Sequence, residues 1–250
     1  MTPLPTPEEL RDRLASMAAE RGFLLPHHGA LAAAAPDLHA AYQAMYSALT
    51  LTDRHLSQFE REFIWLCILV ATREPVGTHH VDLFQRAGGT EDQLRAALRL
   101  TGYAGASGTF GFIEEHCQEH FPGIAAQDDY LAGIDVLNAG AVPPILAHMG
   151  MAAVQMALRN PRGIAAHIVA IYAAPGFEAD LREERLVEAF SLAIWPGGVN
   201  RFVDATRIWH DMVRAETVIP SPRFKARAAL PGQGSFVVQR PRPLTSEATQ

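Results

Sequence analysis

The chain has few cysteines, no long hydrophobic run and no excess of positive charge. Its two cysteines, Cys67 and Cys117, form neither a CxxC pair nor a zinc-finger spacing, which argues against a disulfide scaffold and against a cysteine zinc site. The longest apolar run, residues 63–71, is too short to cross a bilayer. A net charge of −6 argues against a general nucleic-acid binder. We therefore expect a cytoplasmic globular protein that binds neither nucleic acid nor a membrane.

Helix-start signals recur along the chain, whereas strand-like alternation is scarce. The segments Thr6-Pro7-Glu8-Glu9 and Ser57-Gln58-Phe59-Glu60 have the residue order of a capping box, and Thr90 precedes a third such segment. Helices are predicted over residues 37–50, 58–73, 76–87, 91 onward, 110–121, 128–138, 144–158, 163–173, 181–194 and 199–216. Alternation typical of a strand occurs only at residues 235–239. We expect an all-α fold.

An internal repeat is suggested by two histidines that stand 87 residues apart. His80 precedes Gly89 by nine residues, and His167 precedes Gly176 by the same spacing. These matches favour a duplicated helical unit that shares one core. At this offset Met149 takes the place of Glu62, so the second copy is expected to be degenerate. The predicted division is an N-terminal helical segment (1–50), a first repeat (51–125), a degenerate second repeat (126–219) and a tail (220–250).

The tail differs in composition from the rest of the chain. Its prolines and glycines exclude a long helix, and its arginines and Lys225 make it basic within an acidic protein. Two interpretations remain open at this point. The tail is either a solvated extension or an arm that wraps a neighbouring subunit or covers a cleft.

Polar residues flank the most apolar helix of the sequence. Glu62 enters a helix that is apolar on nearly every side, so its carboxylate needs a hydrogen-bond partner or a raised pKa. The next helix begins near His79 and His80, and antiparallel packing would bring these histidines to polar groups near Arg73 and Glu74. The alternative is that Glu62 faces solvent and the histidines only cap a turn.

This order of residues resembles a known superfamily. Glu62, a buried apolar helix, His80 eight residues before Gly88, and then Thr90-Glu91 and Leu94 are similar to the carboxymuconolactone decarboxylase and alkylhydroperoxidase D-like proteins. The resemblance covers residues 51–108 well and residues 144–212 weakly. It implies an alkylhydroperoxidase D-like helical fold with two fused repeats, and a homo-oligomer in which trimer-based forms are favoured over dimers.

Departures from the family pattern separate its branches. The peroxidase branch carries a CxxC pair whose second cysteine lies four residues before the histidine, where this chain has Arg73 and Val76. A thiol peroxidase would therefore lack its nucleophile. The decarboxylase branch resembles an acid–base enzyme that needs no cofactor and no metal and acts on a small carboxylated lactone or related acid of aromatic catabolism. The family's aromatic and acidic residues before the histidine are not matched by residues 75–79, which leaves the lactone substrate open.

A reaction of this kind assigns a role to each candidate residue. His80 is expected to carry the proton because of its spacing from the glycine, with His79 in support. Glu62 is expected to act as a second acid or as an orienting carboxylate. Arg73 is the candidate for binding the substrate carboxylate, and Glu74 is a weaker candidate in the same region.

Other hypotheses stay open beside this one. His116 and His120, with Glu115 or Glu119, have a helical spacing that could hold a metal, although such pairs are more often exposed, and no metal is expected. The chain could also be a peroxidase-like antioxidant enzyme, or a binding or assembly module without activity. An enzyme should bring Glu62, Arg73 and a histidine to one concave site.

Overall fold

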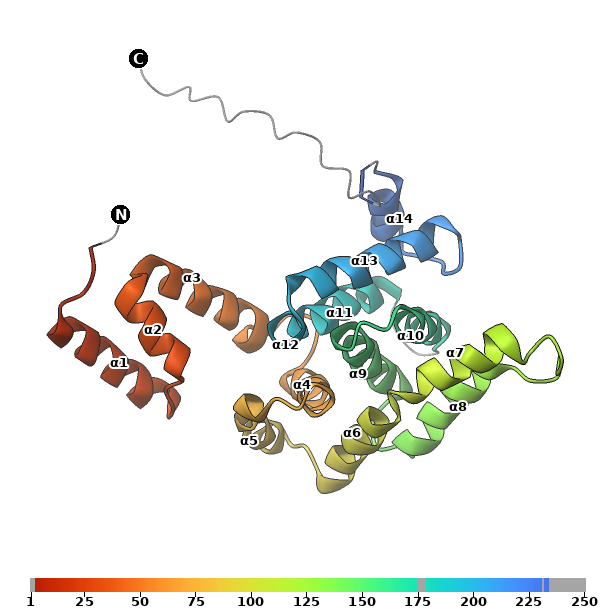
Figure 1. The fold of residues 1–250 in the computed structure, drawn as a ribbon, viewed down its shortest axis with the longest axis horizontal. Helices are drawn as coiled ribbons and strands as arrows, with labels where there is room; N and C mark the ends of the chain where they lie inside the picture. Colours follow the sequence, from red (N-terminus) through yellow and green to blue (C-terminus); the bar gives the residue numbers. More distant parts are fainter. Residues whose placement is uncertain (1–2, 175–178, 231, 234–250) are drawn as a thin grey trace, which may run out of the picture. The chain divides into compact units, whose positions relative to one another are not determined.

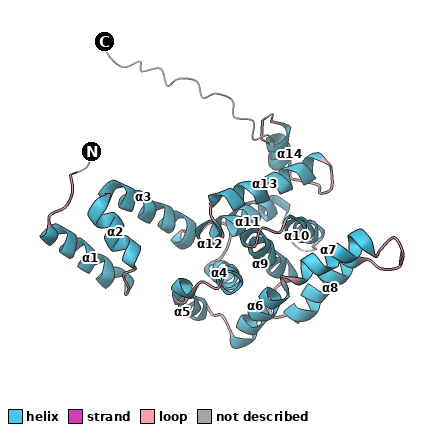
Figure 2. Ribbon diagram, viewed as in Figure 1, coloured by secondary structure: helices cyan, strands magenta, loops and turns pink. Residues whose placement is uncertain are grey.

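The computed structural model describes residues 3–174, 179–230 and 232–233, and its regular elements are helices (Figures 1 and 2). No strand occurs in the part of the chain that the structure describes, and the fold is all-α, as expected. The strand-like residues 235–239 lie outside the described residues. The chain forms two compact units, Met1–Arg54 and His55–Gln250.

The first unit consists of α1 (Pro7–Arg21), α2 (Pro26–Ala34), α3 (Pro36–Tyr46) and a π-helical turn, η1 (Ser47–Leu51). The predicted capping box at Thr6 is present: the N–H of Thr6 donates to the Glu9 carboxylate and the N–H of Glu9 donates to the Thr6 hydroxyl. Two histidines, His28 and His39, are buried in this unit. Burial lowers the pKa of His28 to about 4, so its ring is neutral at pH 7.

The second unit holds the remaining helices around a central one. They are α4 (Gln58–Thr72), η2 (Pro75–Gly77), α5 (His79–Arg86), α6 (Glu91–Tyr103), α7 (Ala106–His116), α8 (Ala126–Asn138), α9 (Pro144–Ala157), α10 (Pro161–Ala173), α11 (Ala179–Leu192), α12 (Ile194–Gly197), α13 (Val199–Arg214) and α14 (Pro222–Ala229). Nearly every residue of α9 is buried, because it packs against α4, α6, α8, α10, α11 and α13. No helix of the described residues has the length and apolarity that a bilayer span requires.

The helix boundaries confirm some expectations and correct others. Capping boxes begin α4 at Ser57 and α6 at Thr90, as predicted. The helix expected to start at residue 76 is instead a 3₁₀ turn followed by α5, and the helix expected over residues 110–121 ends at His116. Within the predicted tail, Ser221 caps the short α14, since a proline is tolerated in the first turn of a helix.

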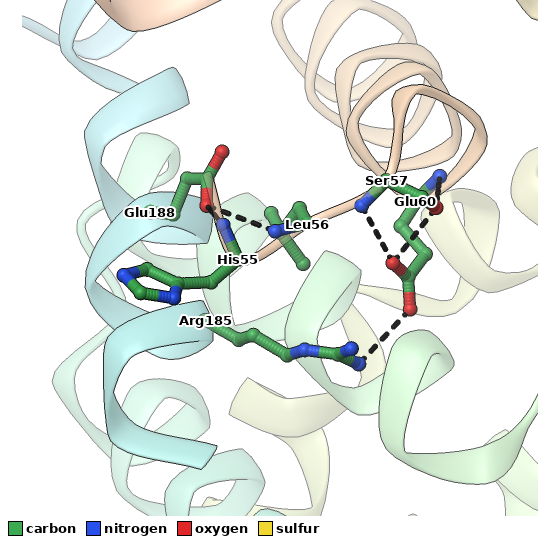
Figure 3. A network of polar contacts seen from close by, with 6 residues as sticks. All are labelled: His55, Leu56, Ser57, Glu60, Arg185 and Glu188. Carbon is green, nitrogen blue, oxygen red and sulfur yellow. Dashed lines mark hydrogen bonds and ion pairs between the residues drawn. The ribbon is translucent and has the colours of Figure 1, made fainter. Parts of the chain in front are cut away.

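Polar contacts from α11 hold the start of α4 (Figure 3). The backbone N–H groups of His55 and Leu56 both donate to Oε2 of Glu188, at 2.9 and 3.0 Å. Arg185, one turn earlier on α11, pairs with Glu60 at 3.2 Å. Glu188 is buried, so its two hydrogen bonds satisfy one carboxylate oxygen and fix the entry of the chain into α4.

Candidate functional site

A buried carboxylate–histidine pair joins α4 to α5. Oε2 of Glu62 lies 2.6 Å from Nδ1 of His80, and each residue is only 2% exposed. Glu62 is the fifth residue of α4, and His80 is the second residue of α5. The pair therefore gives the buried carboxylate of the apolar helix the hydrogen-bond partner that it requires.

The turn between the two helices explains how they come to face each other. Arg73 ends α4 in the left-handed conformation, with φ of 57°, and the N–H of Glu74 donates back to the carbonyl of Leu69 at 3.0 Å. Gly77 then packs against Leu69: a Cβ there would lie 2.3 Å from Cδ2 of that side chain. A larger residue would force the side chain of Leu69 to move, so glycine suits this close approach, after which α5 begins beside the buried carboxylate.

Aromatic rings surround the histidine of the pair. The ring of Trp65 stacks on that of His80, with centroids 4.6 Å apart and planes inclined by 17°. The ring of His79 lies 4.3 Å from that of His80 and its Nδ1 lies 3.3 Å from the carbonyl oxygen of Val76. Burial, and then the positive charge of a protonated His80, lower the pKa of His79. His79 is therefore a neutral neighbour of the pair, next to the backbone of the preceding turn.

The hydrogen bond of the pair sets the tautomer of the imidazole. An ionised Glu62 can only accept, so Nδ1 of His80 carries a hydrogen, and in the neutral imidazole Nε2 is then the nitrogen with the lone pair. Nε2 makes no hydrogen bond within the described residues. A carboxylate that orients an imidazole in this way also stabilises the imidazolium that forms when Nε2 takes a proton.

The structure does not bring Arg73 and Glu74 to the pair. Both side chains are exposed and neither makes a hydrogen bond or an ion pair within the described residues. Eleven residues separate Glu62 from Arg73, which is about 16 Å along a helix. Of the predicted site residues, Glu62, His80 and His79 lie together, whereas the two candidates for substrate binding lie at the far end of α4.

Neither cysteine adds a thiol to this site. Cys67 is fully buried between helices, and burial raises the pKa of its thiol to about 12. Cys117 follows the end of α7 and is half-buried. Cys67 is therefore a small core residue.

A second polar cluster lies where α8, α9 and α10 meet. Nδ1 of His148 lies 3.1 Å from Nδ1 of His167, whose Nε2 lies 2.9 Å from the hydroxyl of Tyr130. The side-chain amide of Gln155 donates to the same hydroxyl at 3.2 Å. On the outer side, Nε2 of His148 lies 3.9 Å from the exposed carboxylate of Asp135. The cluster is a continuous chain of polar groups from the surface into the core.

The two histidines and the tyrosine of this cluster are neutral at pH 7. Burial lowers the pKa values of His148 and His167 and raises that of Tyr130 to about 12. One arrangement of protons gives each contact a donor and an acceptor. In it, Tyr130 donates to His167, His167 donates to His148, and Nε2–H of His148 points to the carboxylate of Asp135.

The second cluster occupies the same place in its helix as the first pair. His148 is the fifth residue of α9, as Glu62 is of α4. By position in the helix, the counterpart of Glu62 is His148, whereas the spacing of the two histidines had pointed to Met149. The alignment on the two histidines has an offset of 87 residues, whereas α4 and α9 begin 86 residues apart.

A shared turn motif could have revealed this register in the sequence. Residues 73–77 and 159–163 both read Arg-x-Pro-x-Gly, again 86 residues apart. The backbone agrees: Arg159 is left-handed with φ of 59°, and the N–H of Asn160 donates to the carbonyl of Gln155 at 2.9 Å. The single extra residue lies between this motif and His167.

The structure separates the two histidines that had suggested a metal site. The α7 helix ends at His116, so His120 lies in the following turn and the two do not share a helix. The side chain of His116 is 58% exposed and lies 3.7 Å from its neighbour Glu115. Among the described residues, no group of three or more histidine, cysteine or acidic side chains could hold a metal ion.

Comparisons with known proteins found no relative of this chain. No family model, curated protein or solved structure matches it. The functional argument therefore depends on the two buried clusters themselves.

Proposed function

We propose that this chain is an acid–base enzyme of the carboxymuconolactone decarboxylase-like type. It acts without a cofactor on a small carboxylated lactone, or on a related acid of aromatic catabolism, by decarboxylation or isomerisation. The observation that carries the proposal is the buried contact of 2.6 Å between Glu62 and His80. A carboxylate and an imidazole held in this way, next to the chain reversal after α4, are suited to moving a proton near neutral pH.

In this proposal His80 is the proton carrier and Glu62 is its positioning partner. Nε2 of His80 takes a proton from the substrate carbon, or returns one to the carbon that has lost carbon dioxide. Glu62 holds the ring in the tautomer that leaves Nε2 free, and its charge stabilises the imidazolium. Trp65 packs against the ring and fixes its orientation.

The duplicated fold is part of the same proposal. Its support is the Arg-x-Pro-x-Gly turn that follows both α4 and α9, and the equivalent positions of Glu62 and His148. The second copy has a histidine where the first has a carboxylate. Its buried His167 therefore lacks an acidic partner in direct contact, and the complete acid–base set belongs to the first copy.

Burial of the pair determines how the proposal should be tested. Removing His80 altogether would leave the carboxylate of Glu62 buried and unpaired, and such a loss typically costs about 3–5 kcal/mol of stability. Glutamine keeps a hydrogen-bonding group at either position but cannot carry the proton. The variants of choice are therefore His80→Gln and Glu62→Gln, compared with His79→Gln.

We expect His80→Gln to lower turnover of carboxylated lactones and related acids by about 10²- to 10⁴-fold. Glu62→Gln should lower kcat, leave KM nearly unchanged and shift the pH–rate profile, because it acts through His80. His79→Gln should lower turnover by a smaller factor than His80→Gln does. The measurement is loss of the starting acid together with release of carbon dioxide, after circular dichroism has shown that each variant is folded.

The exposed His116→Gln is the matched control and should retain the activity of the wild type. Full activity of His80→Gln combined with complete loss in His79→Gln would reverse the two assignments. Full activity in both would refute the mechanism. A wild-type protein that turns over none of these acids would favour a binding or assembly module.

A further inference from the structure

A cleft of about 460 Å³ lies between α13 and the turn that joins α9 to α10. In Figure 1, α13 runs beside these two helices, and contacts between them confirm this packing. Met156, Ile164 and Ile208 give the cleft an apolar floor. Its volume is in the range of small-ligand sites, and its lining includes neither Glu62 nor His80.

The walls of the cleft are unusually basic for an acidic chain. Three guanidinium groups, from Arg159, Arg201 and Arg207, line it together with a single carboxylate, that of Asp204. Arg207 also lies 3.5 Å from Asp211. Within the described residues, Arg159 and Arg201 make no ion pair, and the buried Nε of Arg201 has no hydrogen-bond partner. The cleft therefore has positive charge that the chain itself does not neutralise.

The backbone around the cleft adds to this positive character. The α13 helix is 16 residues long and begins after Gly198 without a side-chain cap. The N–H of Arg201 donates to the carbonyl of Gly198 at 3.1 Å, whereas the N–H groups of Val199 and Asn200 make no hydrogen bond within the described residues. Asn200, in that first turn, lines the cleft. Arg159 takes a left-handed conformation that favours glycine, and its side chain lies at the cleft nevertheless.

We propose that this cleft binds a phosphate monoester with an apolar body. The phosphate dianion would be held by the guanidinium groups and by the N–H groups of Val199 and Asn200 at the start of α13, and the apolar body would rest on the floor. Because Arg207 is paired with Asp211, the charge left for a ligand is that of Arg159 and Arg201, and two guanidinium groups match a dianion better than they match a singly charged carboxylate. This site is independent of the chemistry proposed for the Glu62–His80 pair.

The test is calorimetric titration of the full chain with phenyl phosphate at low ionic strength. We expect saturable binding that weakens as salt is added, weaker binding of inorganic phosphate and no binding of phenol. Arg201→Ala should weaken binding by about tenfold or more. Arg159→Gly should do the same, and since glycine suits the left-handed backbone there, this variant should stay folded.

Two further variants make the experiment specific to the cleft. Asp204→Asn removes the only carboxylate of the lining and should tighten binding. Arg95→Ala removes an exposed arginine that pairs with Glu91 on α6, and it should change nothing. The proposal is overturned if phenyl phosphate does not bind at millimolar concentration, if the folded Arg159→Gly and Arg201→Ala variants bind as the wild type does, or if benzoate binds as tightly as phenyl phosphate.

Discussion

Glutamate and histidine side chains form very different contacts in two parts of this chain. Glu62 and His80 are buried and in close contact, whereas Glu115 and His116 are exposed and 3.7 Å apart. Solvent screens the exposed pair, so it contributes little. Burial holds the first pair in one geometry, strengthens its electrostatic interaction and makes the loss of either partner damaging. Burial, more than residue identity, makes Glu62 and His80 the candidate site.

At the scale of single residues we predict that activity is independent of both cysteines. Cys67→Ala combined with Cys117→Ser should retain turnover to within about tenfold, on the order of 1.4 kcal/mol of barrier, since the thiol of Cys67 is buried and un-ionised. Alanine is the better choice at Cys67 because serine would place a hydroxyl in an apolar core. The measurement is steady-state turnover with and without a thiol-alkylating reagent. A larger loss in a folded double variant would restore the thiol hypothesis.

At the scale of helices, the cluster between α8, α9 and α10 predicts sensitivity to acid. Burial lowers the pKa values of His148 and His167 in the folded chain. On acidification the unfolded chain therefore takes up protons that the folded chain does not. The stability present at neutral pH is therefore lost progressively as the pH falls through about 6.5, where the histidines of the unfolded chain take up protons. Urea unfolding followed by circular dichroism on either side of this pH measures this loss.

The variant that isolates this effect is His167→Gln, which can still accept a hydrogen bond from Tyr130 and donate one to His148. Its stability should depend less on pH than that of the wild type. His116→Gln is exposed and should leave the dependence unchanged. An identical pH dependence in the wild type and in His167→Gln would show that the cluster does not carry it.

Most helices could be predicted from local signals, because local chemistry sets their starts. Thr6, Ser57 and Thr90 each cap a helix through a hydrogen bond to the third residue of that helix. The α2 helix was not predicted because Leu25 precedes it without a side-chain cap, so Pro26 was the only local signal of a helix start. The end of α7 at His116 was missed because no glycine or proline follows until residue 122.

The candidate site could be predicted only in part, because contacts between helices depend on register. Glu62 and His80 were identified from spacing, and they are in contact. Arg73 was placed near them on the assumption that the loop lies beside the histidines, but the chain returns along α4 before α5 begins. The equivalence of His148 and Glu62 was not predicted, because the segment from the turn motif to the histidine is one residue longer before His167 than before His80. An alignment on the shared turn, rather than on His167, would have found it.

At the scale of the whole molecule we predict a homo-oligomer, with trimer-based forms favoured over dimers. The chain exposes large apolar side chains that a monomer would leave in water, among them Val136 and Ile219, which are 76% and 88% exposed. Multi-angle light scattering at micromolar concentration is the measurement, and Val136→Glu should lower the mass if this residue lies in the interface. A wild-type protein that scatters as a monomer contradicts the prediction.

The stacking of Trp65 on His80 also has an optical consequence. An indole at 4.6 Å from an imidazole changes its emission when the imidazole becomes a cation, because the neutral ring pair becomes a cation–π contact. Trp209 differs from Trp65 in its partner, because it stacks on Phe224, with ring centroids 5.0 Å apart. Trp65 is thus a built-in fluorescent reporter of the protonation of His80, and substrates that change this protonation can be followed without a label.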